Sequence, residues 1–175
     1  MMKVKNQKSK IKNWEGMSLL EILIVVTLFA FLGLIVTGSI ILSLQGSKKS
    51  EAQTKVSENL GYTMSIIERQ IRNANSVPDC ATNTDNHILN YTDQNGDATS
   101  FSCINMSGAD PYVASGSGRL TPDDVLVTAC NFTCAPGTAA NPPTVSVFLE
   151  MQSAAGTGSQ TTAISSSTQI QLRSY

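Results

Sequence analysis

The chain has 175 residues and a mass of 18.6 kDa, enough for one ordinary domain with an appendage and too little for two full domains. Its net charge is −1, with 12 basic and 13 acidic residues, but residues 1–16 hold five Lys and a single Glu. The remainder is therefore acidic, which argues against a basic nucleic-acid-binding surface, and we expect no nucleic-acid contact.

The first sixteen residues form a short hydrophilic basic segment that ends in Gly16. An apolar run follows, with no charged residue from Ile22 to Ser47, and it exceeds the ~20 residues that a helix needs to cross a bilayer. No small-residue cleavage site follows that run, unlike in a secretory signal peptide. One interpretation is an uncleaved signal anchor, whose basic start stays in the cytoplasm.

Glu21 lies at the edge of the apolar run and favours a second interpretation. A carboxylate within a spanning segment costs ~2.5–3.5 kcal/mol on insertion scales, so it is a candidate functional residue unless it is merely tolerated at the headgroup level. Cleavage after Gly16 would leave Met17 with a free ammonium four residues before Glu21. The two opposite charges could then pair between neighbouring chains inside lipid.

The segment from Gly16 to Val25, GMSLLEILIV, resembles the prepilin cleavage and methylation motif of type IV pilins and type II secretion pseudopilins. The resemblance implies that a prepilin peptidase cleaves after Gly16, N-methylates Met17 and leaves Glu21 to guide subunit assembly. It also implies an inner-membrane location with one span, a periplasmic or extracellular head, and incorporation into a pilus or pseudopilus. The implied partners are other pilins or pseudopilins, the peptidase, the inner-membrane assembly platform and membrane lipid.

A single long helix is predicted over residues 17–74, because no Pro interrupts it. Residues 19–44 or so would span the membrane. After Gln45 the pattern becomes amphipathic, with Glu51–Lys55 and Glu68–Arg72 as possible i,i+4 ion pairs. The apolar stripe of this second half is Ala52, Val56, Leu60, Met64, Ile67, Ile71 and Ala74.

Residues 75–175 are predicted to form a β-rich head, which makes the fold class α+β with a small antiparallel sheet against the long helix. Asn95-Gly96 predicts a two-residue hairpin turn between strands at 87–93 and 98–104, with Ile88, Phe101 and Cys103 on one face. Further strands are expected at 126–129, 145–151 and 169–173. We expect a loop at 108–118 and a wide polar turn at 154–167.

The head also resembles one branch of the family, the J-type minor pseudopilins and related minor pilins. The similarity lies in residues 64–74 at the helix end, in residues 120–125 with the strand and Phe132 that follow, and in the terminal Gln171-Leu172-Arg173 strand. It implies a minor subunit.

All four cysteines, Cys80, Cys103, Cys130 and Cys134, follow the apolar run. An even count on the exported side indicates disulfides, and four cysteines allow three pairings. We expect Cys80 to pair with Cys103 and Cys130 with Cys134. A zinc site and free buried thiols are the alternatives.

No catalytic motif stands out. His87 is the only histidine, which excludes a multi-histidine metal site, and we expect a polar residue at the start of a strand. Asp93 to Asp97 has some calcium-loop character but lacks the bidentate Glu, so a hairpin turn is the better explanation. Asp123-Asp124 after a Pro is read as turn chemistry. We therefore expect no enzyme, metal or cofactor.

These observations predict a leader at 1–16, a long helix at 17–74 and a head at 75–175. The leading hypothesis is a minor pilin or pseudopilin that assembles through its N-terminal helix. The alternative is a signal-anchored cell-surface binding protein that does not assemble into filaments.

Overall fold

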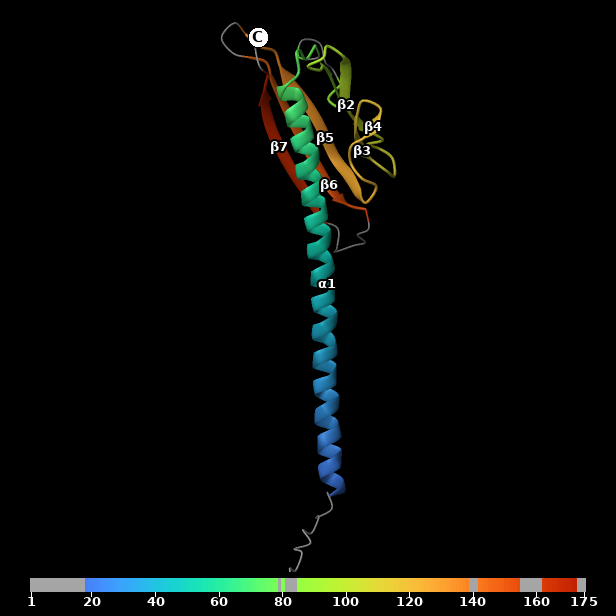
Figure 1. Ribbon diagram of the computed structural model, residues 1–175. Helices are drawn as coiled ribbons and strands as arrows, with labels where there is room; N and C mark the ends of the chain where they lie inside the picture. The colour runs from blue at the N-terminus through green and yellow to red at the C-terminus, as the bar shows by residue number, and fades with distance from the viewer. Residues whose placement is uncertain (1–17, 79, 81–84, 139–141, 155–161, 173–175) are drawn as a thin grey trace, which may run out of the picture. The chain divides into compact units, whose positions relative to one another are not determined.

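A computed structural model of the protein describes residues 18–78, 80, 85–138, 142–154 and 162–172. One helix, α1 (Leu19–Arg72), precedes the strands of an α+β fold, as predicted (Figure 1). The strands are β1 (Ile88–Thr92), β2 (Ala98–Ile104), β3 (Tyr112–Ser115), β4 (Gly118–Arg119), β5 (Val125–Ala135), β6 (Thr144–Ser153) and β7 (Ala163–Gln171).

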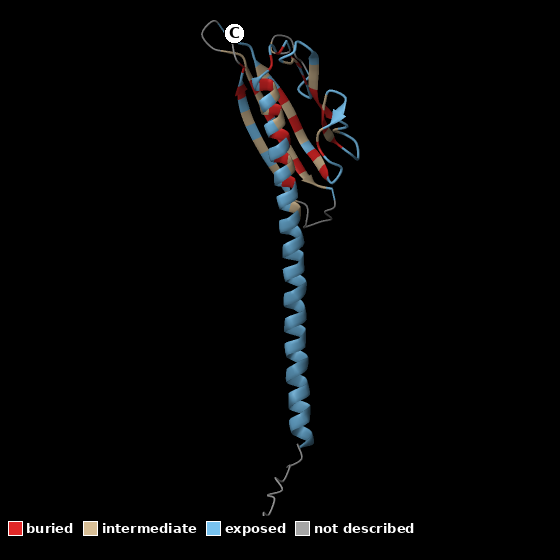
Figure 2. Cartoon of the chain, viewed as in Figure 1, coloured by how far each residue is buried: buried red, intermediate tan, exposed pale blue. Residues whose placement is uncertain are grey.

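The chain divides into two compact units, residues 1–44 and 45–175. In the first unit the described part of α1 is exposed at every position, and Figure 2 shows it uniformly pale blue. The hydroxyls of Thr27, Thr37 and Ser39 each donate to a backbone carbonyl three or four residues earlier, at 2.8, 2.8 and 3.0 Å. The hydrogen bonds of these three hydroxyls are thus satisfied within the helix itself.

In the second unit the predicted apolar stripe of α1 forms one side of the core. Val56, Leu60, Met64, Ile67 and Ile71 are buried there, as expected. The predicted ion pair Glu51–Lys55 is present, with 3.1 Å between its charged atoms. The pair Glu68–Arg72 is not, because a Glu68 carboxylate oxygen instead accepts the hydroxyl of Thr168 on β7 at 2.6 Å.

The strands form two antiparallel sheets, ordered β1-β2-β3-β4 and β5-β6-β7. Backbone hydrogen bonds tie them together: Val127 N donates to Pro111 O at 3.1 Å, and Phe132 N donates to Asn86 O at 2.8 Å. The side chains buried on the strands alternate with exposed ones, the period of two that a half-buried strand requires. The largest buried side chains of the strands are Phe101, Phe132, Leu89, Leu149, Met151 and Ile170.

The first hairpin corrects the predicted register by one residue. The loop spans residues 93–97 instead of two residues, and Thr92 pairs with Ala98. Asp93 closes it, since its carboxylate accepts the backbone N–H groups of Asn95 at 2.8 Å and Asp97 at 2.9 Å. A one-residue shift moves a strand's side chains to the opposite face, so Leu89, and not Ile88, lies with Phe101 in the core.

Other strand boundaries also differ from the predictions. The expected loop at 108–118 contains β3 and β4, joined at Gly116 with a φ of 59°. The expected turn at 154–167 holds the first half of β7, a Ser- and Thr-rich strand without a hydrophobic period. β5 is far longer than the four residues predicted. Arg173, included in the last predicted strand, lies outside the described residues.

Candidate functional site

The predicted processing and assembly residues lie at the start of α1. Gly16 and Met17 are outside the described residues. Glu21 is exposed in the first turn of the helix, where Glu21 N and Ile22 N donate to the carbonyl of Ser18 at 2.9 and 3.2 Å. A carboxylate is favoured there because the N-terminal end of a helix carries partial positive charge.

The helix that carries Glu21 is long and apolar enough to cross a membrane. Its large exposed apolar side chains run from Leu19 to Leu44, and beyond them only Tyr62 on this helix is large and exposed. In water such a surface would be costly, at roughly 25 cal/mol per Å² of apolar area. One candidate span near the N-terminus follows from this composition.

The four cysteines form two disulfides, Cys80–Cys134 and Cys103–Cys130, so the expected pairing is wrong. Cys130 and Cys134 both belong to β5, whose rise of about 3.3 Å per residue separates them by about 13 Å. A disulfide needs Cα atoms within about 7 Å, so the two cannot join. They instead lie on the same face of β5, four residues apart, and are bonded to two different segments: the chain after α1 and strand β2.

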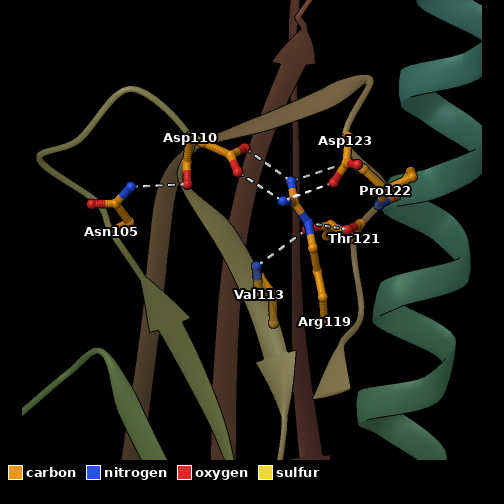
Figure 3. A network of polar contacts seen from close by, with 7 residues as sticks. All are labelled: Asn105, Asp110, Val113, Arg119, Thr121, Pro122 and Asp123. Atoms are coloured by element: carbon orange, nitrogen blue, oxygen red, sulfur yellow. Dashed lines mark hydrogen bonds and ion pairs between the residues drawn. The ribbon is translucent and has the colours of Figure 1, made fainter. Parts of the chain in front are cut away.

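A cluster of polar residues surrounds Arg119 (Figure 3). Its guanidinium donates to both carboxylate oxygens of Asp110 at 2.8 and 2.9 Å and pairs with Asp123 at 2.8 Å, while Nε donates to Thr121 O at 2.8 Å. The guanidinium carbon also lies 4.6 Å from the centre of the Tyr112 ring. The hydrogen bonds from Arg119 lower the pKa of the Asp110 carboxyl.

A cleft of about 670 Å³ opens between the end of α1 and the first hairpin. Arg69, Gln70 and Asn73 line its helix side, and the hairpin side includes Tyr91 and Asp93. The Tyr91 hydroxyl donates to Gln70 Oε1 at 2.6 Å, and burial raises the pKa of that phenol. The Asp93 carboxyl has a lowered pKa, because it accepts the backbone N–H groups of its own turn, first that of Asp97. The polar groups at the cleft therefore bind one another and close the hairpin onto the helix.

No known protein family, curated protein or solved structure matches this chain. Functional inference therefore rests on the residues and their geometry.

His87 sits at the start of the first hairpin, as the sequence suggested, and has a specific contact. Its Nδ1 lies 3.0 Å from the carbonyl oxygen of Cys130, and a carbonyl can only accept, so this contact requires the proton on Nδ1. Among the residues with described positions, no group of three or more His, Cys, Asp or Glu could hold a metal ion.

The polar contacts that hold the segments of the head together were not predicted from the sequence. Asp110 lies in the segment expected to be a loop and Arg119 directly follows that segment, and nothing in the spacing of nine residues signals their pairing. Gln70 was predicted only to be helical, yet its Oε1 accepts a hydrogen bond from the Tyr91 hydroxyl on β1. Asp123 and Asp124 lie in a turn, as predicted. The Asp123 carboxylate pairs with Arg119 there, and the backbone carbonyl of Asp124 accepts Ala154 N at 2.9 Å.

Proposed function

We propose that this chain is a minor pilin or pseudopilin, a structural subunit of a type IV pilus or type II secretion pseudopilus. The observation that carries the proposal is α1 itself. It holds an exposed acid, Glu21, in its first turn, then an uncharged apolar segment to Leu44, and then an amphipathic segment on a β-rich head. The prepilin-like motif at residues 16–25 coincides with the start of this helix.

A role in subunit assembly would explain why an acid, Glu21, lies at the apolar end of the helix. After cleavage following Gly16, the Met17 ammonium of one subunit would pair with Glu21 of a neighbour. Removing one partner of a buried ion pair typically costs about 3–5 kcal/mol, because the remaining charge is left buried without compensation. The apolar faces of adjacent helices would hold the subunits together, and the pairing would fix how far one helix slides along the next.

The proposed work is assembly and not catalysis. The subunit would wait in the inner membrane, lose its leader to the prepilin peptidase, and enter the filament from the assembly platform with its head on the periplasmic or extracellular side. Two disulfides suit an oxidising compartment.

Processing and assembly are tested with two variants of the full chain in cells. Gly16→Val should keep the leader, because a branched side chain would obstruct the peptidase at the cut site, and the membrane-bound mass should stay that of 175 residues. Glu21→Leu should be cut normally and inserted at least as well, since a charge has left the apolar segment. Its recovery in sheared filaments, or with a co-expressed major subunit, should fall at least tenfold.

The matched control is Glu51→Leu, which removes an exposed acid of the same helix beyond the apolar segment. It should assemble like the parent. Normal trimming of Gly16→Val would refute the cut site. Equal assembly of Glu21→Leu and the parent would refute the pairing mechanism and favour the signal-anchored surface protein, in which Met1 should remain the N-terminus.

A further inference from the structure

A groove of about 280 Å³ lies on the outer side of the three-stranded sheet. Three neighbouring strands build it in register: Asn131 on β5 lies opposite Phe148 on β6, which lies opposite Ser167 on β7. Thr133, Ser146 and Gln169 form the next row in the same way. Along β6 these positions alternate with the buried Val147 and Leu149, so the two rows face away from the core.

Phe148 stands at the centre of this surface with 40% of its area exposed. It is the one aromatic residue on the three strands whose side chain is not in the core, since Phe132 is 1% exposed. Residues with hydroxyl and amide side chains, Asn131, Thr133, Ser167 and Gln169, occupy the neighbouring positions on both adjacent strands. An open aromatic face framed by neutral hydrogen-bonding groups suits a ligand with an apolar face and a polar rim.

The near absence of charged residues on the sheet restricts which ligands could bind in the groove. Glu150 is the only charged residue of β5, β6 and β7, and it does not line the groove. An anionic ligand would find no cation there and would meet a carboxylate one row away, opposite Ala129 and Ser165. The groove therefore suits an uncharged ligand.

One wall of the groove contains an unmet hydrogen-bond acceptor. Asn131 Oδ1 is covered and has no partner, an arrangement that is rare for polar atoms in folded proteins. A ligand hydroxyl would supply the missing donor once the amide turns toward the groove. The side chains of Thr133, Ser146, Ser167 and Gln169 add hydroxyls, which both donate and accept, and a second amide.

We propose that this groove binds a neutral sugar ring. The C–H face of a pyranose would stack on Phe148, and its ring hydroxyls would bond to Asn131, Ser167 and Gln169. The volume, at the lower end of ligand sites, suits one ring of a longer glycan with the rest lying outside. This surface function is separate from filament assembly, which uses α1.

The test uses the full chain in micelles of lauryldimethylamine oxide, a detergent without a sugar headgroup. Saturation-transfer NMR is recorded with glucose, galactose and N-acetylglucosamine, and with glucuronate as the anionic counterpart. At least one neutral sugar should receive saturation, strongest at the C–H protons of one ring face, with a Kd on the order of 1 mM. Glucuronate should receive none.

Three variants then locate the site. Phe148→Ser should weaken binding at least tenfold, and Gln169→Ala should weaken it less. Ile88→Ser, which replaces a similarly exposed apolar residue (37%) on the other sheet, should bind like the parent. Peptide mapping of both disulfides confirms that each variant has folded.

Four outcomes would overturn the proposal. They are absence of saturation for every neutral sugar, equal saturation of glucuronate, unchanged binding by Phe148→Ser, and equal loss in Ile88→Ser. If Phe148→Ser instead lowers only the recovery of the chain with other filament subunits, the exposed ring is a contact between subunits and not a sugar platform.

Discussion

Thr63 is a buried residue whose hydroxyl lowers the stability of the head. Its side chain lies on the buried face of α1, fully inaccessible, and its hydroxyl has no hydrogen-bond partner. A hydroxyl taken from water into an apolar core without a partner costs free energy on folding. The predicted apolar stripe omitted this position because Thr is polar, although its size and shape match Val.

Thr63→Val should therefore raise the free energy of unfolding by about 1 kcal/mol, because a methyl replaces an unsatisfied hydroxyl of nearly the same shape. Chemical denaturation monitored by circular dichroism measures the change. Thr54→Val is the control, since Thr54 is exposed and donates to Ser50 O at 3.0 Å, so that variant should gain nothing. A loss of stability in Thr63→Val would show that the hydroxyl has a partner, such as a buried water.

The Asp110 carboxylate should make the stability of the head depend on pH. The hydrogen bonds from Arg119 lower the pKa of this carboxyl in the folded state, so its contribution to stability is fully present above the unfolded pKa of about 3.9 and fades as pH falls through the lower folded value. Asp110→Asn should thus lower the denaturation midpoint at pH 7, and the gap to the parent should narrow as the pH falls below the unfolded pKa of about 3.9. Asp124→Asn is the matched control, because it removes a neighbouring exposed carboxyl that makes no ion pair with Arg119, and it should leave the midpoint at pH 7 unchanged. A gap for Asp110→Asn that is constant with pH would contradict the ionic origin of the effect.

At the scale of elements, the sequence predicted those parts whose pattern is local. The helix, its apolar stripe and the middle strand β6 follow from periodicity and were correct. The register of the first hairpin was not, because the Asn95-Gly96 signal favours a two-residue turn while the Asp93 carboxylate closes a longer one. The first half of β7 has no apolar alternation, since its exposed Ser residues face solvent and its inner side is only partly covered. The pairing of the cysteines depended on the length of β5, which the sequence did not reveal.

The two disulfides are nested, and this arrangement predicts how each contributes. Cys80–Cys134 spans 54 residues and encloses Cys103–Cys130, which spans 27. With the inner bridge closed, the outer loop shortens to about 28 residues, so loop entropy alone gives each bridge ~3.5 kcal/mol. The two disulfides should therefore differ in stabilisation mainly through how deeply their cysteines are buried. Cys103 and Cys130 are 8% and 3% exposed, whereas Cys80 and Cys134 are only partly buried.

The double variant Cys103→Ala, Cys130→Ala should accordingly lose more stability than Cys80→Ala, Cys134→Ala, as measured by denaturant unfolding under non-reducing conditions. The difference should be about 1 kcal/mol, because the inner pair also fills core volume. Equal losses would mean that chain entropy accounts for the whole effect. A peptide map with Cys130 linked to Cys134 would contradict the fold of β5.

At the scale of the whole molecule, the two units differ in what they need to be stable. Among the residues with described positions, those of the hydrophobic core lie between Val56 and Leu172, and none comes from residues 18–44. The first unit has an exposed apolar surface over the described residues 18–44, which is long and apolar enough to cross a membrane. The second buries its own core and contains both disulfides.

A fragment of residues 45–175, exported to an oxidising compartment, should therefore be soluble and fold without detergent. It should unfold in one cooperative transition and give linked peptides for both observed disulfides. A shorter fragment that begins at residue 61 removes Val56 and Leu60 and should be less stable by at least 3 kcal/mol. Equal stability of the two fragments, or aggregation of the longer one, would show that the head depends on the first unit.

The nested bridges also set how far the head can be stretched. When tension is applied between α1 and the C-terminal strand, the force passes from Cys80 directly to Cys134 and bypasses the chain between them. The 54-residue separation corresponds to about 180 Å of extended chain that stays out of the load path while this bridge is oxidised. While this bridge is oxidised, only the chain outside it can extend under tension, and a reducing environment would release the enclosed length.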